Sequence, residues 1–207
     1  MRTIEQILQN AFNKSGVDKN SEKVRSLLRL LKTELSIYTE PSKKEPRHLL
    51  RSDATFSKCG KYRYALWRIW DETKPEVMFL MLNPSTADGT TDDPTIRRCI
   101  AFAKAWGYGG ILVGNLYAYR ATDPDELNKV KDPVGPANAF YLSQLSLKVE
   151  TVVCAWGSKV TKGGFTLPSF VGVKIVTLGL NKDGTPKHPL YVKGDAQPIE
   201  FKPEKVK

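Results

Sequence analysis

The stretch from Glu76 to Asp88, EVMFLMLNPSTAD, decides the fold. Its apolar part, residues 77–82, is too continuous to alternate between a core and water. Such runs are typical of parallel strands that are buried on both faces. The polar turn from Asn83 to Thr86 would therefore lie at the carboxyl end of a buried strand, where open α/β sheets bind ligands. We treat this turn as a candidate site, although it could also be an ordinary turn between a strand and a helix.

Strand and helix patterns alternate after this stretch. A helix is predicted from Pro94 to Trp106, with Asp93 as its cap, and a second helix is predicted over residues 134–149. Three more strands are predicted by the apolar runs at residues 111–119, 151–156 and 171–178. This order is that of a parallel sheet with helices on both faces. We expect a three-layer α/β/α sandwich with a central, mainly parallel four-stranded sheet.

The chain before this strand divides into three segments. Residues 1–38 carry apolar stripes at helical spacing and predict an N-terminal helical hairpin. Residues 39–61 are interpreted as a linker because they are rich in proline, serine, lysine and glutamate. Residues 62–70 alternate as a strand does, and we expect the turn at 71–75 to join them to the next strand as a hairpin. The α/β domain would then span residues 62–207.

Composition and charge narrow the function classes. Of the 207 residues, 41% are hydrophobic, but no apolar run approaches the ~20 residues that span a bilayer, and the N-terminus lacks the apolar core of a signal peptide. We therefore expect a cytoplasmic protein without a membrane partner. Three widely spaced cysteines predict free thiols. The formal net charge of +10 favours a polyanionic partner such as DNA. No phosphate-loop, dinucleotide, serine-hydrolase or zincin pattern is present, and we expect no metal, no cofactor and no obligate protein partner.

The motifs LNPSTAD, DDPTIRRC, NLYAYRATDP, DPVGPAN and AWG together resemble the phage and bacterial DUF1643 family over roughly residues 62–192. The layout also resembles the uracil-DNA glycosylase superfamily. In that superfamily, Asn-Pro or Asp-Pro follows a first parallel strand, a base-reading Asn ends the second, Trp-Gly often ends the third, and a His-Pro loop follows the fourth. The matching positions here are Asn83 with Pro84, Asn115, Trp156 with Gly157, and His188 with Pro189.

The resemblance implies a DNA glycosylase that hydrolyses the N-glycosidic bond of a uracil-like or modified base, including a hypermodified phage base. Such enzymes flip the target nucleotide out of the duplex and stabilise negative charge on the departing base. By this resemblance, His188 donates to the leaving base oxygen, Asn115 reads the amide-like edge of the base, and Asn83 positions the attacking water. Asn83 could instead only cap its turn, and Asn115 could bond to the exit of a neighbouring strand.

Further residues of the implied site lie in the same loops. If a carboxylate is needed as a base, we expect Asp88 first and then Asp92 or Asp93, although each of them could be only a cap. Leu190 or Tyr191 would enter the space that the flipped base leaves. The full set of expected substrate-binding residues is Pro84, Ser85, Thr86, Asn115, Tyr117, Arg120, Leu190 and Tyr191.

Two other functions stay open. A metal-dependent phosphoryl or nucleotide hydrolase would use Asp88, Asp92, Asp93 and His188 as ligands of Mg²⁺ or Mn²⁺, and EDTA would abolish its activity. A non-catalytic nucleic-acid-binding protein would bind DNA with a steep salt dependence and release no product.

Overall fold

The computed structural model describes residues 51–159, 167, 170 and 172–202. These residues lie in the second of two compact units into which the chain divides, His48–Lys207. The helical hairpin predicted for residues 1–38 lies outside the described residues. Within the described part, no helix has both the length and the apolar character that crossing a membrane requires.

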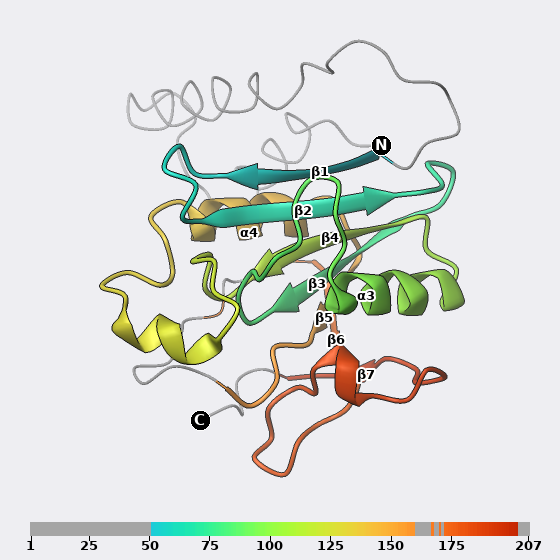
Figure 1. Cartoon of the computed structure of the whole chain (residues 1–207). Coiled ribbons are helices and arrows are strands. Elements are labelled where there is room, and N and C mark those ends of the chain that lie inside the picture. The colour runs from blue at the N-terminus through green and yellow to red at the C-terminus, as the bar shows by residue number, and fades with distance from the viewer. Residues whose placement is uncertain (1–50, 160–166, 168–169, 171, 203–207) are drawn as a thin grey trace, which may run out of the picture. The chain divides into compact units, whose positions relative to one another are not determined.

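The described residues form a mixed seven-stranded sheet in the order β1-β2-β4-β3-β5-β6-β7 (Figure 1). The strands are β1 (Arg51–Phe56), β2 (Arg63–Ile69), β3 (Glu76–Met81), β4 (Gly110–Asn115), β5 (Thr151–Cys154), β6 (Lys174–Thr177) and β7 (Ile199–Glu200). β3 runs parallel to β4 and β5, and β5 runs parallel to β6. β1, β2 and β7 pair antiparallel with their neighbours. The α/β class is confirmed, whereas the expected number of four strands is wrong, because antiparallel strands extend the sheet on both sides.

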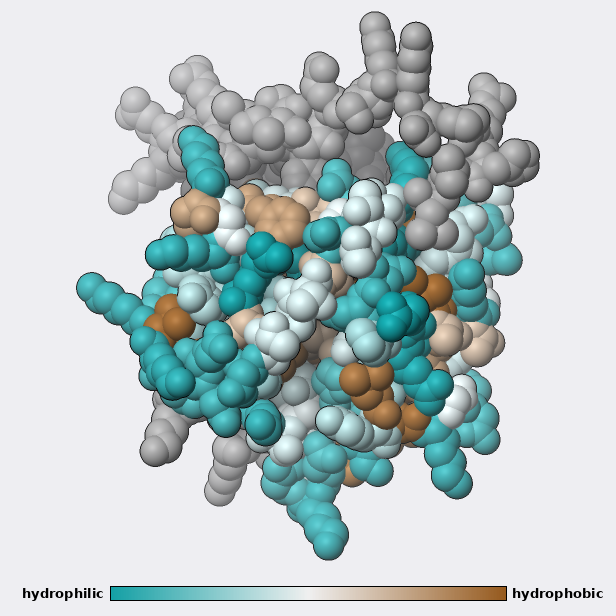
Figure 2. Space-filling model, in the orientation of Figure 1, coloured by the Kyte–Doolittle hydropathy of each residue, from teal (hydrophilic) through white to brown (hydrophobic). Residues whose placement is uncertain are grey.

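The two α-helices in the described part of the chain cover opposite faces of the sheet. α3 (Pro94–Ala105) packs with Phe79 of β3 in one core cluster. α4 (Asn138–Ser146) packs with Met78 of β3 in a second cluster on the other face. β3 is therefore buried on both faces, as its unbroken apolar run predicts. On the face of the molecule that Figure 2 shows, the described residues are largely hydrophilic, with hydrophobic residues in small separate patches.

Local sequence explains where both helices begin. Asp93 accepts a hydrogen bond from the N–H of Ile96, which confirms the predicted cap of α3, and Pro94 occupies the first turn, where no N–H is needed. α4 begins at Asn138, later than predicted. The delay follows from Gly135, whose φ of 86° lies outside the helical region.

The predicted hairpin between β2 and β3 is wrong, because β4 lies between these two strands. The short turn can reach across β4, since neighbouring strands are only about 4.8 Å apart. The N–H groups of Trp70 and Asp71 both donate to Gly109 O at 2.9 Å, just before β4 begins. A Cβ atom at Gly109 would lie 1.9 Å from Asp71 O, so this close crossing requires glycine.

β1 adds a strand within the segment that was interpreted as a linker. That interpretation is wrong for residues 51–56, which pair antiparallel with β2 along the edge of the sheet. An edge strand can be polar because one side of it stays in contact with water, so its sequence carries little apolar signal. Two short 3₁₀-helices, η1 (Pro124–Lys129) and η2 (Pro189–Tyr191), are further elements that the sequence did not predict.

Candidate functional site

The carboxyl ends of the four parallel strands lie at one edge of the sheet. Residues near these ends pair in register: Met81 with Asn115, Leu80 with Cys154, and Cys154 with Thr177. In Figure 1 the arrowheads of β3 and β4 point to the same side as the turn between β1 and β2. Loops from distant parts of the sequence therefore meet along this edge, and we call it the carboxyl edge.

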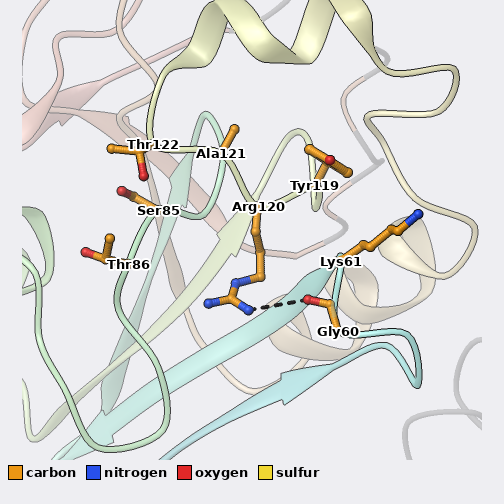
Figure 3. Close-up of a pocket in the computed structure, with 8 residues that line it drawn as sticks. All are labelled: Gly60, Lys61, Ser85, Thr86, Tyr119, Arg120, Ala121 and Thr122. Carbon is orange, nitrogen blue, oxygen red and sulfur yellow. Dashed lines mark hydrogen bonds between the residues drawn. The ribbon is translucent and has the colours of Figure 1, made fainter.

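A pocket of about 400 Å³ opens at the carboxyl edge (Figure 3). It is lined by Gly60, Lys61, Ser85, Thr86, Tyr119, Arg120, Ala121 and Thr122. The lining has two basic side chains and three aliphatic hydroxyl groups but no carboxylate. Such a lining favours an anionic ligand, because guanidinium and hydroxyl groups donate hydrogen bonds to phosphate or carboxylate oxygens.

The Arg120 side chain lies between the two sides of this pocket. Its Nη1 donates to Gly60 O at 3.3 Å, and its guanidinium carbon lies 5.0 Å from the centre of the Phe56 ring. Figure 3 shows Ser85 and Thr86 on the other side of the guanidinium, whereas the Lys61 side chain points away from them. Arg120 is therefore the cation best placed to meet a ligand in the pocket.

Sequence reasoning found only part of this lining. Ser85, Thr86 and Arg120 were expected, because they follow the two central strands. The other residues were missed: Gly60, Lys61, Tyr119, Ala121 and Thr122. Gly60 and Lys61 could have been found only by recognising β1, because the turn between β1 and β2 brings them to the carboxyl edge.

Asn83 holds one wall of the pocket together. Its Nδ2 donates to Ala121 O at 2.7 Å and to Pro84 O at 3.1 Å, and the N–H of Ala121 donates to Pro84 O at 3.0 Å. These bonds join the turn after β3 to the loop after β4. Both amide hydrogens of Asn83 are thus engaged with the backbone, and its Oδ1 is the side-chain atom left to meet a water or a ligand.

Asn115 ends β4 and contacts a buried cation that sequence reasoning missed. Arg63 of β2 donates through Nη2 to Asn115 Oδ1 at 3.3 Å and through Nη1 to Ala87 O at 2.8 Å. Desolvation lowers the pKa of Arg63 to about 10, which still leaves it charged at neutral pH. Asn138 Nδ2 donates to the carbonyl oxygens of Asn115 and Leu116. Asn115 therefore bonds to the first residue of the neighbouring strand β2 and not to the end of a neighbouring strand.

The three candidate carboxylates each have a local structural partner. Asp88 accepts from the N–H groups of Thr90 and Thr91, and these bonds lower its pKa and make it a weaker base. Asp92 pairs with Arg68 Nε at 2.8 Å, and Asp93 caps α3. Among the described residues, no group of three or more His, Cys, Asp or Glu side chains could hold a metal ion. The ligand set considered for a metal-dependent hydrolase is therefore not assembled.

His188 lies beside the chain segment that leaves β5. A Cβ atom on Gly157 would lie 3.5 Å from His188 Cβ, and the N–H of Gly157 donates to Pro186 O. His188 Nδ1 accepts from the N–H of Leu190 at 3.4 Å, so in the neutral ring the hydrogen resides on Nε2. Burial lowers the pKa of His188, with Asp93 opposing this effect, so the ring is neutral at pH 7. The side chain is thus prepared to donate from Nε2.

Two exposed hydrophobic side chains follow His188 in η2. Leu190 is 44% exposed and Tyr191 is 82% exposed. Arg98 of α3 supports their turn, donating to the carbonyl oxygens of Pro189 and Val192. Neither these side chains nor His188 lines the pocket around Arg120.

Three expected substrate-binding residues are buried: Asn115, which is 2% exposed, Tyr117 and Pro84. Tyr117 belongs to the core cluster on the α4 face and does not line the pocket, which corrects its expected place. It was misplaced because alternate residues after β4 face opposite sides, and the sequence alone does not show which side reaches the edge. Pro84 is also buried, and its carbonyl oxygen joins the pocket wall.

Comparisons with curated proteins and with solved structures gave no match. The family model described as "Protein of unknown function (DUF1643)" matches residues 63–190. The matched region begins with β2, includes the whole parallel part of the sheet and extends into η2, so it contains every candidate catalytic residue at the carboxyl edge. The chain therefore belongs to the DUF1643 family.

Proposed function

We propose that this protein is a DNA glycosylase-like hydrolase that cleaves the N-glycosidic bond of a uracil-like or modified base, and that its domain has the architecture of the uracil-DNA glycosylase superfamily. One observation carries the proposal. The Asn-Pro, Asn, Trp-Gly and His-Pro positions each follow or end one of four mutually parallel strands, so their loops share one edge of the sheet.

The chemistry of the departing base supports a role for His188. When the N-glycosidic bond breaks, the base gains negative charge, and preorganised hydrogen-bond donors around that charge are usually the largest catalytic contribution. A neutral imidazole with its hydrogen on Nε2 is such a donor, and the bond between Nδ1 and the N–H of Leu190 fixes this tautomer. His188 would thus stabilise the departing base without first losing a proton.

The remaining steps fall to other groups at the carboxyl edge. Arg120, with the hydroxyl groups of the pocket, would bind the DNA backbone beside the flipped nucleotide. Leu190 and Tyr191 are exposed and would enter the vacated base stack. Asn83 Oδ1 would accept a hydrogen bond from the attacking water, and it serves better than Asp88, whose carboxylate is held by its own turn.

A non-catalytic nucleic-acid-binding protein is the second candidate. The hydrogen bonds of Asn83 favour it, because both amide hydrogens serve the fold of the loop and leave one acceptor for chemistry. The lining of the pocket suits DNA binding in either case.

Base release distinguishes the two candidates. Purified protein is incubated, in EDTA, with DNA that carries uracil, hydroxymethylpyrimidines or glucosylated bases, and released base and alkali-labile abasic sites are measured. We expect release that His188→Ala and Asn83→Ala abolish. Lys174→Ala, exposed at the opposite end of β6, is the control and should retain full activity. Salt-sensitive binding without release from any substrate would refute the glycosylase proposal and favour the binding protein.

A further inference from the structure

Arg63 is a buried cation that has no carboxylate partner in the part of the chain that the structure describes. It is 3% exposed, its two Nη atoms donate to neutral oxygens, and its Nε has no hydrogen-bond partner among the described residues. Burying a cation costs several kcal/mol unless an anion and a full set of hydrogen bonds compensate. A contribution to the stability of the fold therefore does not explain why an arginine is buried at this position.

Arg68 of the same strand provides an internal comparison. It is 1% exposed, yet its Nε forms an ion pair with Asp92 at 2.8 Å and its Nη2 donates to Asp88 O at 2.7 Å. Arg68 thus has the partners that a structural buried arginine requires. Arg63, which is nearer the carboxyl edge, lacks them.

The position of Arg63 fixes the orientation of the Asn115 amide. A guanidinium group only donates hydrogen bonds, so the amide atom that faces Nη2 at 3.3 Å must be Oδ1. Two bonds from Asn138 hold the backbone carbonyls at this strand end and prevent a compensating rotation of the chain. Asn115 Nδ2 consequently points away from Arg63, and it donates to no atom among the described residues.

This orientation changes what Asn115 can recognise. An amide that reads a uracil-like edge uses one donor and one acceptor, but here Arg63 already bonds to one of the two lone pairs of Oδ1, which makes Oδ1 a weaker acceptor toward a ligand. The donor remains, and it is strengthened because a hydrogen bond from a cation to Oδ1 polarises the amide. Its natural partner is a carbonyl oxygen or an unprotonated ring nitrogen, most of all one that gains negative charge.

We propose that Arg63 is a positioning residue that locks Asn115 as a hydrogen-bond donor, so that the site selects a base presenting an acceptor atom to Asn115 Nδ2. This inference rests on the proposed glycosylase function. It differs from the expectation that Asn115 reads an amide-like edge through both of its side-chain atoms.

Substitutions of Arg63 and of Asn115 test whether Arg63 fixes the orientation of the Asn115 amide. Asn115→Asp keeps a partner for Arg63 and should fold, but it removes the donor, so we expect kcat to fall by about 100- to 1,000-fold. Arg63→Met removes the lock and should lower kcat by about 10- to 100-fold with a smaller change in KM. Arg63→Gln can still donate a hydrogen bond to Asn115 Oδ1, so its kcat should lie between that of Arg63→Met and that of the unsubstituted protein.

A spectroscopic measurement separates positioning from general damage. The side-chain NH₂ signal of Asn115 in a ¹H–¹⁵N spectrum, assigned by its loss in Asn115→Asp, should shift and exchange faster with water in Arg63→Met. In Arg68→Met, which loses a buried arginine of the same strand, the Asn115 signal should stay in place. Addition of the DNA panel to the 207-residue chain should shift the Asn115 signal further.

The outcomes distinguish failure of the inference from failure of the proposed function. An unchanged Asn115 signal in Arg63→Met, or unchanged kcat in Asn115→Asp, would overturn the inference while leaving the glycosylase intact. If the unsubstituted protein releases no base from any DNA, the proposed function fails. The signal shift in Arg63→Met and its response to DNA would then still decide whether Arg63 positions Asn115 for a ligand.

Discussion

Replacement of Asn83 separates its structural role from its proposed role in positioning water. Asn83→Ala removes the hydrogen bonds to Ala121 O and Pro84 O, at 2.7 and 3.1 Å. A typical net contribution of about 1 kcal/mol for each bond gives a loss of roughly 2 kcal/mol in the free energy of unfolding. For a chain of this size, such a loss lowers Tm by about 4–8 °C.

Asn83→Asp extends the test through its pH dependence. At pH 7 the introduced carboxylate cannot donate a hydrogen bond and faces two carbonyl oxygens. The free energy of unfolding should therefore fall by more than it does in Asn83→Ala. These oxygens raise the pKa of the carboxyl group in the folded state above its unfolded value of about 3.9. A raised folded pKa adds stability below the unfolded pKa, so Asn83→Asp should recover stability relative to Asn83→Ala as the pH falls from 7 to 4.

The assay is urea unfolding of the 207-residue chain, followed by tryptophan fluorescence at several pH values. Thr86→Ala is the control, because Thr86 is an exposed residue of the same turn, and it should change stability by less than about 0.5 kcal/mol. If Asn83→Ala is as stable as this control, the two bonds do not hold the pocket wall. Any loss of base release in Asn83→Ala would then report on catalysis alone.

Three further predictions concern the histidine, a chain crossing and the pocket. Burial lowers the pKa of His188 in the folded state, so the unfolded chain binds more protons than the folded chain below about pH 6.5. The free energy of unfolding should therefore fall as the pH drops through that region. His188→Asn should remove this part of the pH dependence, measured by urea unfolding. Gly109→Ala places a Cβ atom 1.9 Å from a backbone oxygen and should lower the free energy of unfolding by more than about 3 kcal/mol. Gly194→Ala is the control, because its Cβ atom meets only ordinary contacts and the change should be nearly neutral. Equal stabilities of the two variants would contradict the close approach of Gly109 to the turn after β2. Arg120→Gln should weaken DNA binding and, if one phosphate contact is lost, reduce the slope of log K against log salt by about 0.9, whereas Lys174→Gln should leave the slope unchanged in fluorescence anisotropy titrations.

Local sequence was sufficient where the signal of an element lies within the element itself. The unbroken apolar run of β3 predicted a strand buried on both faces, and Asp93 with Pro94 predicted the start of α3. These predictions succeed because side-chain periodicity and helix capping depend on residues only a few positions apart. The alternation of strands and helices likewise determined the α/β class.

Only the tertiary structure decided which strands are neighbours and which polar groups meet. β4 separates β2 from β3, and polar β1 joins the edge of the sheet, because pairing depends on burial across the whole sheet rather than on the sequence of one strand. The same pairing brings Arg63 of β2 against Asn115 of β4 and joins the turn before β2 to the loop after β4 as a pocket. The sequence determined the residues available at the carboxyl edge, and the long-range contacts determined their partners.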